Sequence, residues 1–223
     1  MAIKNNKVTV IDYGMGNLFN VVRALESINC DVYVTDDIST IIKSERLLLP
    51  GVGAFEDGIR DLKENNLDNA IKEFAQTGKP LLGICLGMQL FMTNSEENGI
   101  HNGLDLIKGK VIRFRDPNDH NDKYKIPQIG WNVLSPPNKK RNGLGNKHWD
   151  NSILKDFDKK LYMYFLHSYY VVLEDERVCL SETFYGRDLF CSVFQKNQII
   201  GCQFHPERSG EQGLKILKNF LSL

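Results

Sequence analysis

Residues 79–89 read Lys-Pro-Leu-Leu-Gly-Ile-Cys-Leu-Gly-Met-Gln. An apolar run leads into the pattern G-x-C-x-G, and the residues after it, through Met88, Leu90 and Phe91, are typical of a helix. A strand that turns sharply into a helix strains its central residue and lifts that side chain clear of the sheet, while flanking glycines let neighbouring backbone approach closely. The pattern therefore predicts that Cys85 is a nucleophile at a strand–helix turn, where the helix N-terminus favours a thiolate.

The alternative is a buried structural cysteine that follows a core strand. The four other cysteines lack such flanking glycines, and we expect them to be core residues: Cys30, Cys179, Cys191 and Cys202. Five cysteines without a C-x-x-C pair argue against a disulfide framework or a zinc ribbon. They favour a reducing cytoplasm, which fits a start that runs into a strand-like Lys-Val-Thr-Val-Ile-Asp without the apolar core of a signal peptide.

Residues 199–208 read Ile-Ile-Gly-Cys-Gln-Phe-His-Pro-Glu-Arg. An apolar strand delivers His205 to its C-terminal end, the edge at which open α/β sheets bind their ligands. Glu207 follows two residues later, close enough to accept the second ring N–H of the histidine and hold its tautomer. We therefore expect His205 to be the base and Glu207 to be its orienting carboxylate. His167 is the competing candidate, but it has no carboxylate at close spacing.

Short apolar runs alternate with amphipathic segments along the first half of the chain. The expected strands are 8–11, 31–35, 46–49 and 80–84, and the expected helices are 21–28, 55–63 and 67–75. This alternation predicts an α/β fold with a mostly parallel central sheet flanked by helices. In the second half, runs at short spacing predict antiparallel strands at one side of that sheet, before a closing helix at 211–221. These runs are 111–114, 162–166, 169–173, 178–183, 189–194 and 199–204.

Two polar stretches, 115–125 and 135–151, are predicted to be surface loops, and neither is typical of a linker, so we expect residues 1–223 to form one domain. One of them contains residues that could be drawn as a metal site but lack recognised ligand spacing: Asp116, Asp119, His120 and Asp122. We therefore expect no metal and no cofactor. Lys plus Arg and Asp plus Glu both total 28, so the balanced charge predicts neither nucleic acid nor an anionic membrane as a partner. No apolar run approaches the roughly 20 residues that cross a bilayer.

Taken together, the motifs G-x-C-x-G, P-G-V-G and F-H-P-E resemble those of the class I glutamine amidotransferases. Further blocks, spread in order over nearly the whole chain, are similar to the glutaminase subunits of imidazole glycerol phosphate synthase: Ile11–Leu18, Leu49–Phe55, Gly83–Phe91, Gln128–Asn132, Phe165–Tyr169 and Phe204–Ser209. The resemblance is specific, since neither Tyr-Gly-Met-Gly-Asn nor Ile-Gly-Trp-Asn is general to class I enzymes. It implies the class I amidotransferase fold and the hydrolysis of L-glutamine to glutamate.

The same resemblance implies roles for individual residues. Cys85 attacks the side-chain amide to form a glutamyl thioester, His205 moves the proton to departing ammonia, and Glu207 completes the triad. The implied oxyanion hole consists of the Leu86 backbone N–H and one N–H from Gly51, Val52 or Gly53, after a peptide reorientation that glycine makes cheap. The implied substrate contacts are Gln89, Glu97, Ser168 and Tyr169.

The resemblance also implies a partner, a (β/α)8-barrel cyclase subunit in a heterodimer that receives the ammonia for histidine biosynthesis. Asn17, Trp131 and Arg208 are expected on or near that interface. Close paralogues instead supply ammonia to enzymes that modify bacterial surface sugars, and the active-site motifs cannot separate these two functions. A third hypothesis is a non-enzymatic binding subunit that keeps only the fold, and an intact triad argues against it.

Overall fold

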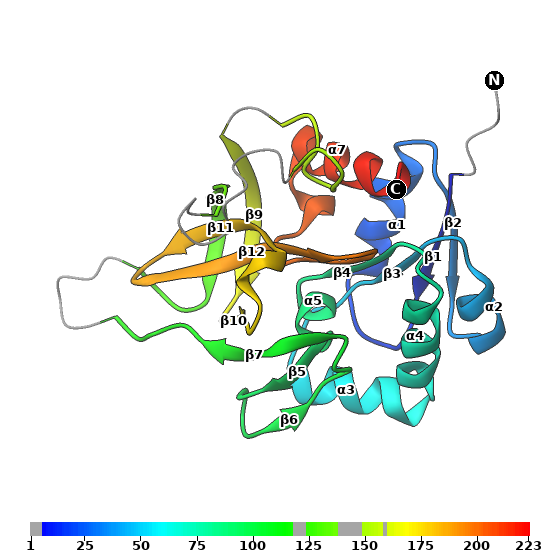
Figure 1. Ribbon diagram of the computed structural model, residues 1–223, viewed down its shortest axis with the longest axis horizontal. Helices are drawn as coiled ribbons and strands as arrows, with labels where there is room; N and C mark the ends of the chain where they lie inside the picture. Colours follow the sequence, from blue (N-terminus) through cyan, green and yellow to red (C-terminus); the bar gives the residue numbers. More distant parts are fainter. Residues whose placement is uncertain (1–5, 118–123, 138–148, 158–159) are drawn as a thin grey trace.

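The computed structural model describes residues 6–117, 124–137, 149–157 and 160–223. Its central sheet contains the strands β1 (Lys7–Ile11), β2 (Asp31–Thr35), β3 (Leu47–Leu49), β4 (Leu81–Ile84), β11 (Cys179–Tyr185), β12 (Asp188–Lys196) and β13 (Ile199–Cys202). Their order is β11-β12-β13-β4-β3-β1-β2 (Figure 1). Neighbours from β13 to β2 pair in parallel, whereas β11 and β12 extend the sheet with antiparallel pairing. The predicted α/β fold with a mostly parallel sheet is confirmed.

Helices cover both faces of this sheet: α1 (Leu18–Glu26), α2 (Ile38–Lys43), α3 (Phe55–Glu64), α4 (Leu67–Gln76), α5 (Leu86–Leu90) and α7 (Gly210–Leu221). Successive side chains of a strand point to opposite faces. Leu48 and Leu82 therefore belong to the core that contains α1 and α7. Leu47, Leu49 and Leu81 belong to the other core, with α2 to α5. No helix within the described ranges is long and apolar enough to span a membrane.

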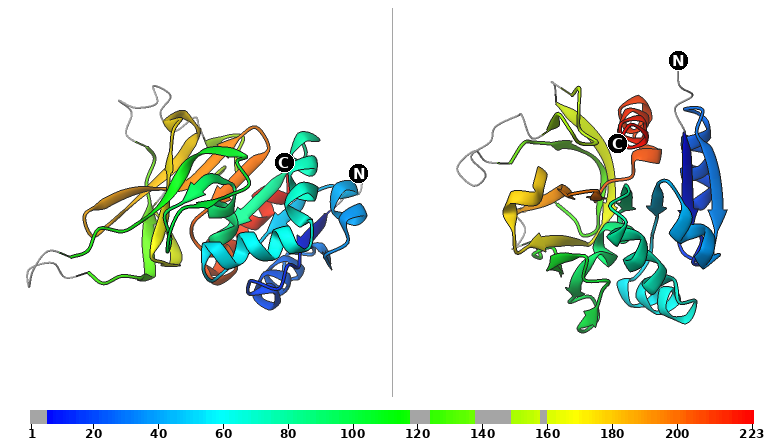
Figure 2. Two further views of the ribbon diagram at one scale, coloured as in Figure 1. Left: turned by 90° about the horizontal axis from the view of Figure 1, so that it is seen from below. Right: turned by 45° about the vertical axis from the view of Figure 1, so that its right-hand side comes forward.

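The remaining strands form two smaller sheets: β5 (Met92–Ser95), β6 (His101–Asn102), β7 (Ile107–Arg113) and β10 (Tyr169–Leu173) in one, and β8 (Gln128–Leu134) and β9 (Leu161–His167) in the other. The prediction that runs 111–114, 162–166 and 169–173 join the side of the central sheet is therefore wrong. An alternating pattern fixes which residues share a face of a strand, but it does not name the partner strand. Figure 2 shows these strands gathered at one end of the molecule and most helices at the other.

The two expected surface loops are described only in part, because residues 118–123 and 138–148 lie outside the described ranges. The end of the second stretch departs from the expectation. Trp149 is buried and donates its indole N–H to the Leu180 carbonyl oxygen at 2.7 Å, since a buried indole N–H requires an acceptor. That residues 1–223 form one domain stays a prediction.

Candidate active site

Cys85 occupies the turn between β4 and α5 with φ 53° and ψ −107°. A positive φ is costly for an L-residue other than glycine and is held here by its surroundings. The Cys85 backbone N–H donates to the carbonyl oxygen of Cys202 at 2.8 Å, which fastens the turn to β13. Gly87 must be a glycine, because a Cβ there would lie 2.0 Å from the Leu49 carbonyl oxygen. The thiol is nearly buried, with Cys85 5% exposed.

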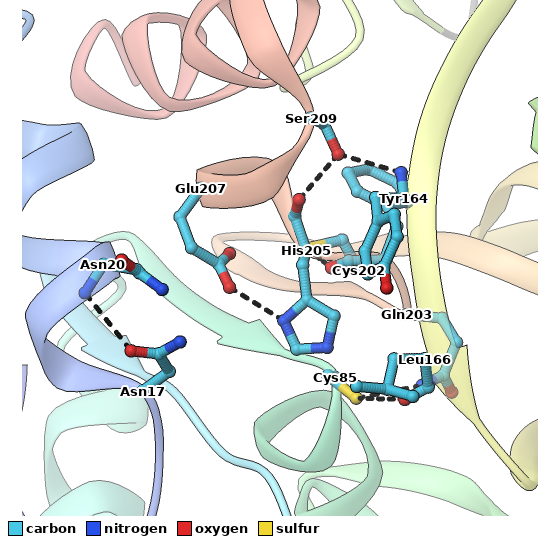
Figure 3. A network of polar contacts seen from close by, with 11 residues as sticks. Asn17, Asn20, Cys85, Tyr164, Leu166, Cys202, Gln203, His205, Glu207 and Ser209 are labelled. Carbon is cyan, nitrogen blue, oxygen red and sulfur yellow. Dashed lines mark hydrogen bonds and ion pairs between the residues drawn. The ribbon is translucent and has the colours of Figure 1, made fainter. Parts of the chain in front are cut away.

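His205 lies just beyond β13, before the 3-10 turn Pro206–Arg208. Its Nδ1–H donates to Glu207 Oε1 at 2.8 Å, and both side chains are almost completely buried. The ring points toward Cys85 (Figure 3), and Nε2 has no hydrogen-bond partner among the described residues. Burial alone would lower the pKa of His205, but the charges of Cys85 and Glu207 outweigh it and raise the pKa to about 10. The site therefore favours the protonated, charged form of the His205 ring.

Ser209 fixes the segment that carries the histidine, a role that the sequence did not reveal. Its hydroxyl donates to the His205 carbonyl oxygen at 2.6 Å and accepts the Tyr164 backbone N–H at 2.9 Å (Figure 3). The His205 backbone N–H in turn donates to the Tyr164 carbonyl oxygen at 2.9 Å. The predicted base is thereby tied to β9 as well as to β13.

A pocket beside Cys85 encloses about 650 Å³ of empty space, part of it open to solvent. The predicted substrate contacts Gln89, Glu97, Ser168 and Tyr169 all line it. Glu97 Oε2 accepts the backbone N–H of Phe55 at 2.8 Å, and burial raises the pKa of this carboxyl group. The structure thus brings these four predicted residues together around Cys85, the predicted nucleophile.

Of the four residues predicted for the oxyanion hole, Val52, Gly53 and Leu86 line the same pocket, whereas Gly51 does not line it. In this conformation the Leu86 N–H is occupied, because it donates to the Gly51 carbonyl oxygen at 3.3 Å. Rotation of the peptide between Gly51 and Val52 would withdraw that carbonyl and turn the Val52 N–H in its place. Gly53, with φ 110°, already has a backbone conformation that favours glycine.

Tyr13 also acts on this loop, and no motif in the sequence pointed to such a role. Its hydroxyl donates to the Pro50 carbonyl oxygen at 2.9 Å, and the side chain is 3% exposed. A Cβ on Gly51 would lie 2.6 Å from the same hydroxyl oxygen. Tyr13 lies inside the block Ile11–Leu18, but nothing in the pattern indicated what its phenol contacts.

His167, the competing candidate for the base, also lines the pocket. Its Nδ1 lies 2.8 Å from the Tyr169 carbonyl oxygen, which can only accept, so Nδ1 carries the proton. Burial lowers the pKa of His167 to about 3. The ring is therefore neutral at ordinary pH, and the histidine that faces a carboxylate is His205.

Two of the residues expected at a partner interface, Trp131 and Arg208, pack against the same tyrosine ring. Trp131 is 58% exposed and packs edge-on against Tyr164, and the Arg208 guanidinium lies 4.5 Å from the centre of the same ring. Asn17 begins α1, where its side chain accepts the Asn20 backbone N–H at 3.4 Å. Figure 3 places Asn17 on the side of the triad nearest Glu207.

Within the described ranges, no cluster of three or more His, Cys, Asp or Glu side chains is arranged to hold a metal ion. Asp119, His120 and Asp122, which could be drawn as ligands from the sequence, lie outside those ranges. The expectation that the protein uses no metal stays a prediction.

Comparison with known proteins gives one family. Residues 9–223 match the sequence model of glutamine amidotransferase class-I. The chain is 40% identical over 218 residues to imidazole glycerol phosphate synthase subunit HisH 1 of Legionella pneumophila (strain Paris), covering 98% of this chain and 100% of that one. It is 41% identical over 216 residues to subunit HisH of Geobacillus sp. (strain WCH70), covering 97% and 96%.

Solved structures agree on the fold. The structure of PurLQS from Thermotoga maritima matches with a TM-score of 0.64 at 19% identity, covering 97% of each chain. The crystal structure of a glutamine amidotransferase from Thermotoga maritima matches with a TM-score of 0.56 at 19% identity, covering 94% of this chain and 79% of that one.

Proposed function

We propose, since this chain belongs to the class I glutamine amidotransferases and among them to the HisH glutaminase subunits of imidazole glycerol phosphate synthase, that Cys85, His205 and Glu207 are its catalytic triad. The observation that carries the assignment is the buried 2.8 Å contact between His205 and Glu207, with the other side of the histidine ring turned to Cys85. A carboxylate that fixes one nitrogen leaves the other free for proton transfer with the nucleophile.

The chemistry follows from these groups. The Cys85 thiolate attacks the side-chain amide carbon of L-glutamine, and the His205 imidazolium gives its Nε2 proton to the departing ammonia. The resulting glutamyl thioester is hydrolysed by water, whose proton returns to the neutral His205, and glutamate and the thiolate are restored. The pKa of about 10 for His205 in the resting site is consistent with an acid that is charged before attack.

Substrate binding uses other residues that line the same pocket. Glu97 Oε2 is held by the Phe55 N–H, so Oε1 is the oxygen that we assign to the α-ammonium group of glutamine. The backbone of Ser168 and Tyr169 and the side chain of Gln89 contact the rest of the substrate. The oxyanion is bound by the N–H groups of Leu86 and Val52 once the Gly51 carbonyl has left. Loss of one such donor costs about 3 kcal/mol of transition-state stabilisation.

The ammonia goes to a partner, which we assign as a (β/α)8-barrel cyclase subunit in a heterodimer. The proposed contact surface consists of Asn17 and of the exposed side chains of Trp131 and Arg208, which pack on the half-buried Tyr164. A dry conduit keeps ammonia neutral and therefore nucleophilic. Relatives named as imidazole glycerol phosphate synthase subunits favour this acceptor over a surface-sugar enzyme.

We assign the protein to the cytoplasm. All five cysteines are free and buried, which suits a compartment that keeps thiols reduced.

The test uses the chain together with the cyclase subunit from the same genome. Glutamine should drive cyclisation in the complex, and Cys85→Ala should abolish that activity while leaving the reaction driven by added ammonium salt intact. Glu207→Gln should lower the glutamine-driven rate by about 100-fold or more. Equal glutamine-driven rates for wild type and Cys85→Ala would refute the triad. Failure to complement a histidine auxotroph, with activity restored by a sugar-modifying partner, would refute the acceptor.

A further inference from the structure

A buried amide touches the nucleophile from the side away from the triad carboxylate. Gln203 lies between β13 and His205 and is completely buried, and its backbone N–H donates to the Ser192 carbonyl oxygen at 3.0 Å. Its Nε2 lies 3.6 Å from the Cys85 sulfur (Figure 3). A polar side chain that is removed from water beside a reactive atom needs partners for both ends of its amide.

The orientation of this amide follows from its neighbours. The Tyr169 carbonyl oxygen can only accept, so the Gln89 atom that lies 2.9 Å from it is the NH2 group. The same NH2 group donates its second hydrogen to Gln203 Oε1 at 3.1 Å. The other end of the Gln203 amide is then its NH2 group, which faces the sulfur as a donor. The chain of hydrogen bonds runs from the pocket wall through two amides to the nucleophile.

A donor aimed at the sulfur favours one protonation state. A thiolate accepts a hydrogen bond much better than a thiol does, so the Gln203 N–H stabilises the charged form without adding a charge to the buried site. The thiol form has a different partner, the Leu166 carbonyl oxygen at 3.8 Å. Because α5 is only five residues long, a side-chain donor next to the sulfur matters more here than it would at the end of a long helix.

We infer that Gln203 is a positioning residue that holds the Cys85 sulfur in its reactive, deprotonated orientation, and that Gln89 keeps the Gln203 amide turned the right way. The inference rests on the proposed function, because it concerns the nucleophile of glutamine hydrolysis.

The test compares Gln203→Met and Gln203→Leu with wild type. Both variants lack the donor, and the two apolar side chains fill the space differently. The readout is the rate of Cys85 alkylation by iodoacetamide as a function of pH, followed by mass spectrometry of the Cys85 peptide in the full chain. The pH of half-maximal rate should rise by about one unit. In the complex with the cyclase, kcat for glutamine hydrolysis should fall about tenfold while KM changes less than about twofold.

Asn219→Leu is the matched control, because Asn219 is also a buried amide, and its NH2 group donates to the carbonyl oxygens of Ile153 and Lys155 and not to Cys85. It should lower the melting temperature and leave the alkylation profile unchanged. Equal shifts in the control and in the Gln203 variants, or an unshifted profile in a folded Gln203 variant, would overturn the inference. If wild type itself does not hydrolyse glutamine with its partner, the proposed function has failed instead.

A measurement on wild type covers the case in which neither variant folds. In 15N-labelled protein, the Gln203 side-chain N–H resonances should move with pH at the same midpoint as Cys85 alkylation. They should lose this movement in Cys85→Ala. Resonances that ignore pH in wild type would contradict the inference.

Discussion

The backbone N–H of Leu86 donates to the carbonyl oxygen of Gly51, with 3.3 Å between nitrogen and oxygen. A group that we assign to the oxyanion hole is thus already paired within the protein. We expect the isolated chain to hydrolyse glutamine at least about 100-fold more slowly than its complex with the cyclase, the typical effect of one lost donor. Initial rates of glutamate formation, with and without the partner, measure this ratio. Full turnover by the isolated chain would be inconsistent with an occupied donor.

Tyr13→Phe tests whether the phenol anchors the oxyanion loop. Burial raises the pKa of Tyr13 well above its usual range, so the hydroxyl remains a donor to the Pro50 carbonyl oxygen. Without it, that buried carbonyl loses its partner and the peptides on either side of Gly51 gain freedom. We expect the free energy of unfolding to fall by about 1–2 kcal/mol. We also expect kcat in the complex to fall several-fold, with KM for glutamine unchanged.

Tyr185→Phe is the control for Tyr13→Phe. It removes a tyrosine hydrogen bond of similar length in an exposed place outside the oxyanion loop, from Tyr185 to the Lys125 carbonyl oxygen at 2.8 Å. Its kcat should match wild type. A Tyr13→Phe complex with an unchanged kcat would show that the phenol only stabilises the fold.

The His205 ring should lose its proton only at alkaline pH. Burial lowers its pKa, but Cys85 and Glu207 together raise the value to about 10. A pKa raised by folding stabilises the native state fully below about 6.5, and this contribution disappears as the pH rises through about 10. NMR titration of the imidazole should therefore place the midpoint near 10, as a property of the coupled thiolate–imidazolium pair. In Cys85→Ala the midpoint should move to lower pH, and an unmoved midpoint would exclude the pair.

The buried, neutral His167 should make the stability of the fold sensitive to acid. Burial lowers its pKa to about 3, whereas the unfolded chain binds the proton near 6.5. Unfolding therefore takes up a proton between these values, and stability falls by about 1.4 kcal/mol per pH unit below 6.5. Denaturant titrations of wild type and His167→Gln at several pH values between 4 and 7 measure the difference in slope. Parallel slopes would mean that His167 is protonated in the folded protein.

The sequence predicted the parts of the site that follow from strand order. Cys85 and His205 each follow an apolar run, and parallel strands bring such positions to one edge of a sheet. It did not predict Gln203 or Tyr13, because their roles depend on which side chains face them across the fold. The role of Ser209 in fixing the His205 segment was not predicted for the same reason.

The sequence also did not predict which of the later strands pair with one another. The run at 162–166 was correctly expected to be a strand, but β9 pairs with β8, which was not expected, and not with the central sheet. Likewise, Trp149 follows a polar stretch that suggested solvent exposure, yet tertiary packing buries it.

Adjacent hydrogen-bonded strands, β4 and β13, lead to the proposed nucleophile and the proposed base. Ile84 is paired with Cys202, and the next backbone contact joins Cys85 to Cys202. The separation of sulfur and imidazole is therefore set by a sheet ladder, whereas the oxyanion donors depend on the loop after β3. A partner that moves only the loop after β3 would therefore turn transition-state stabilisation on and off, while Cys85 and His205 keep their relative positions. The enzyme would then be inactive without its partner although its triad remains assembled.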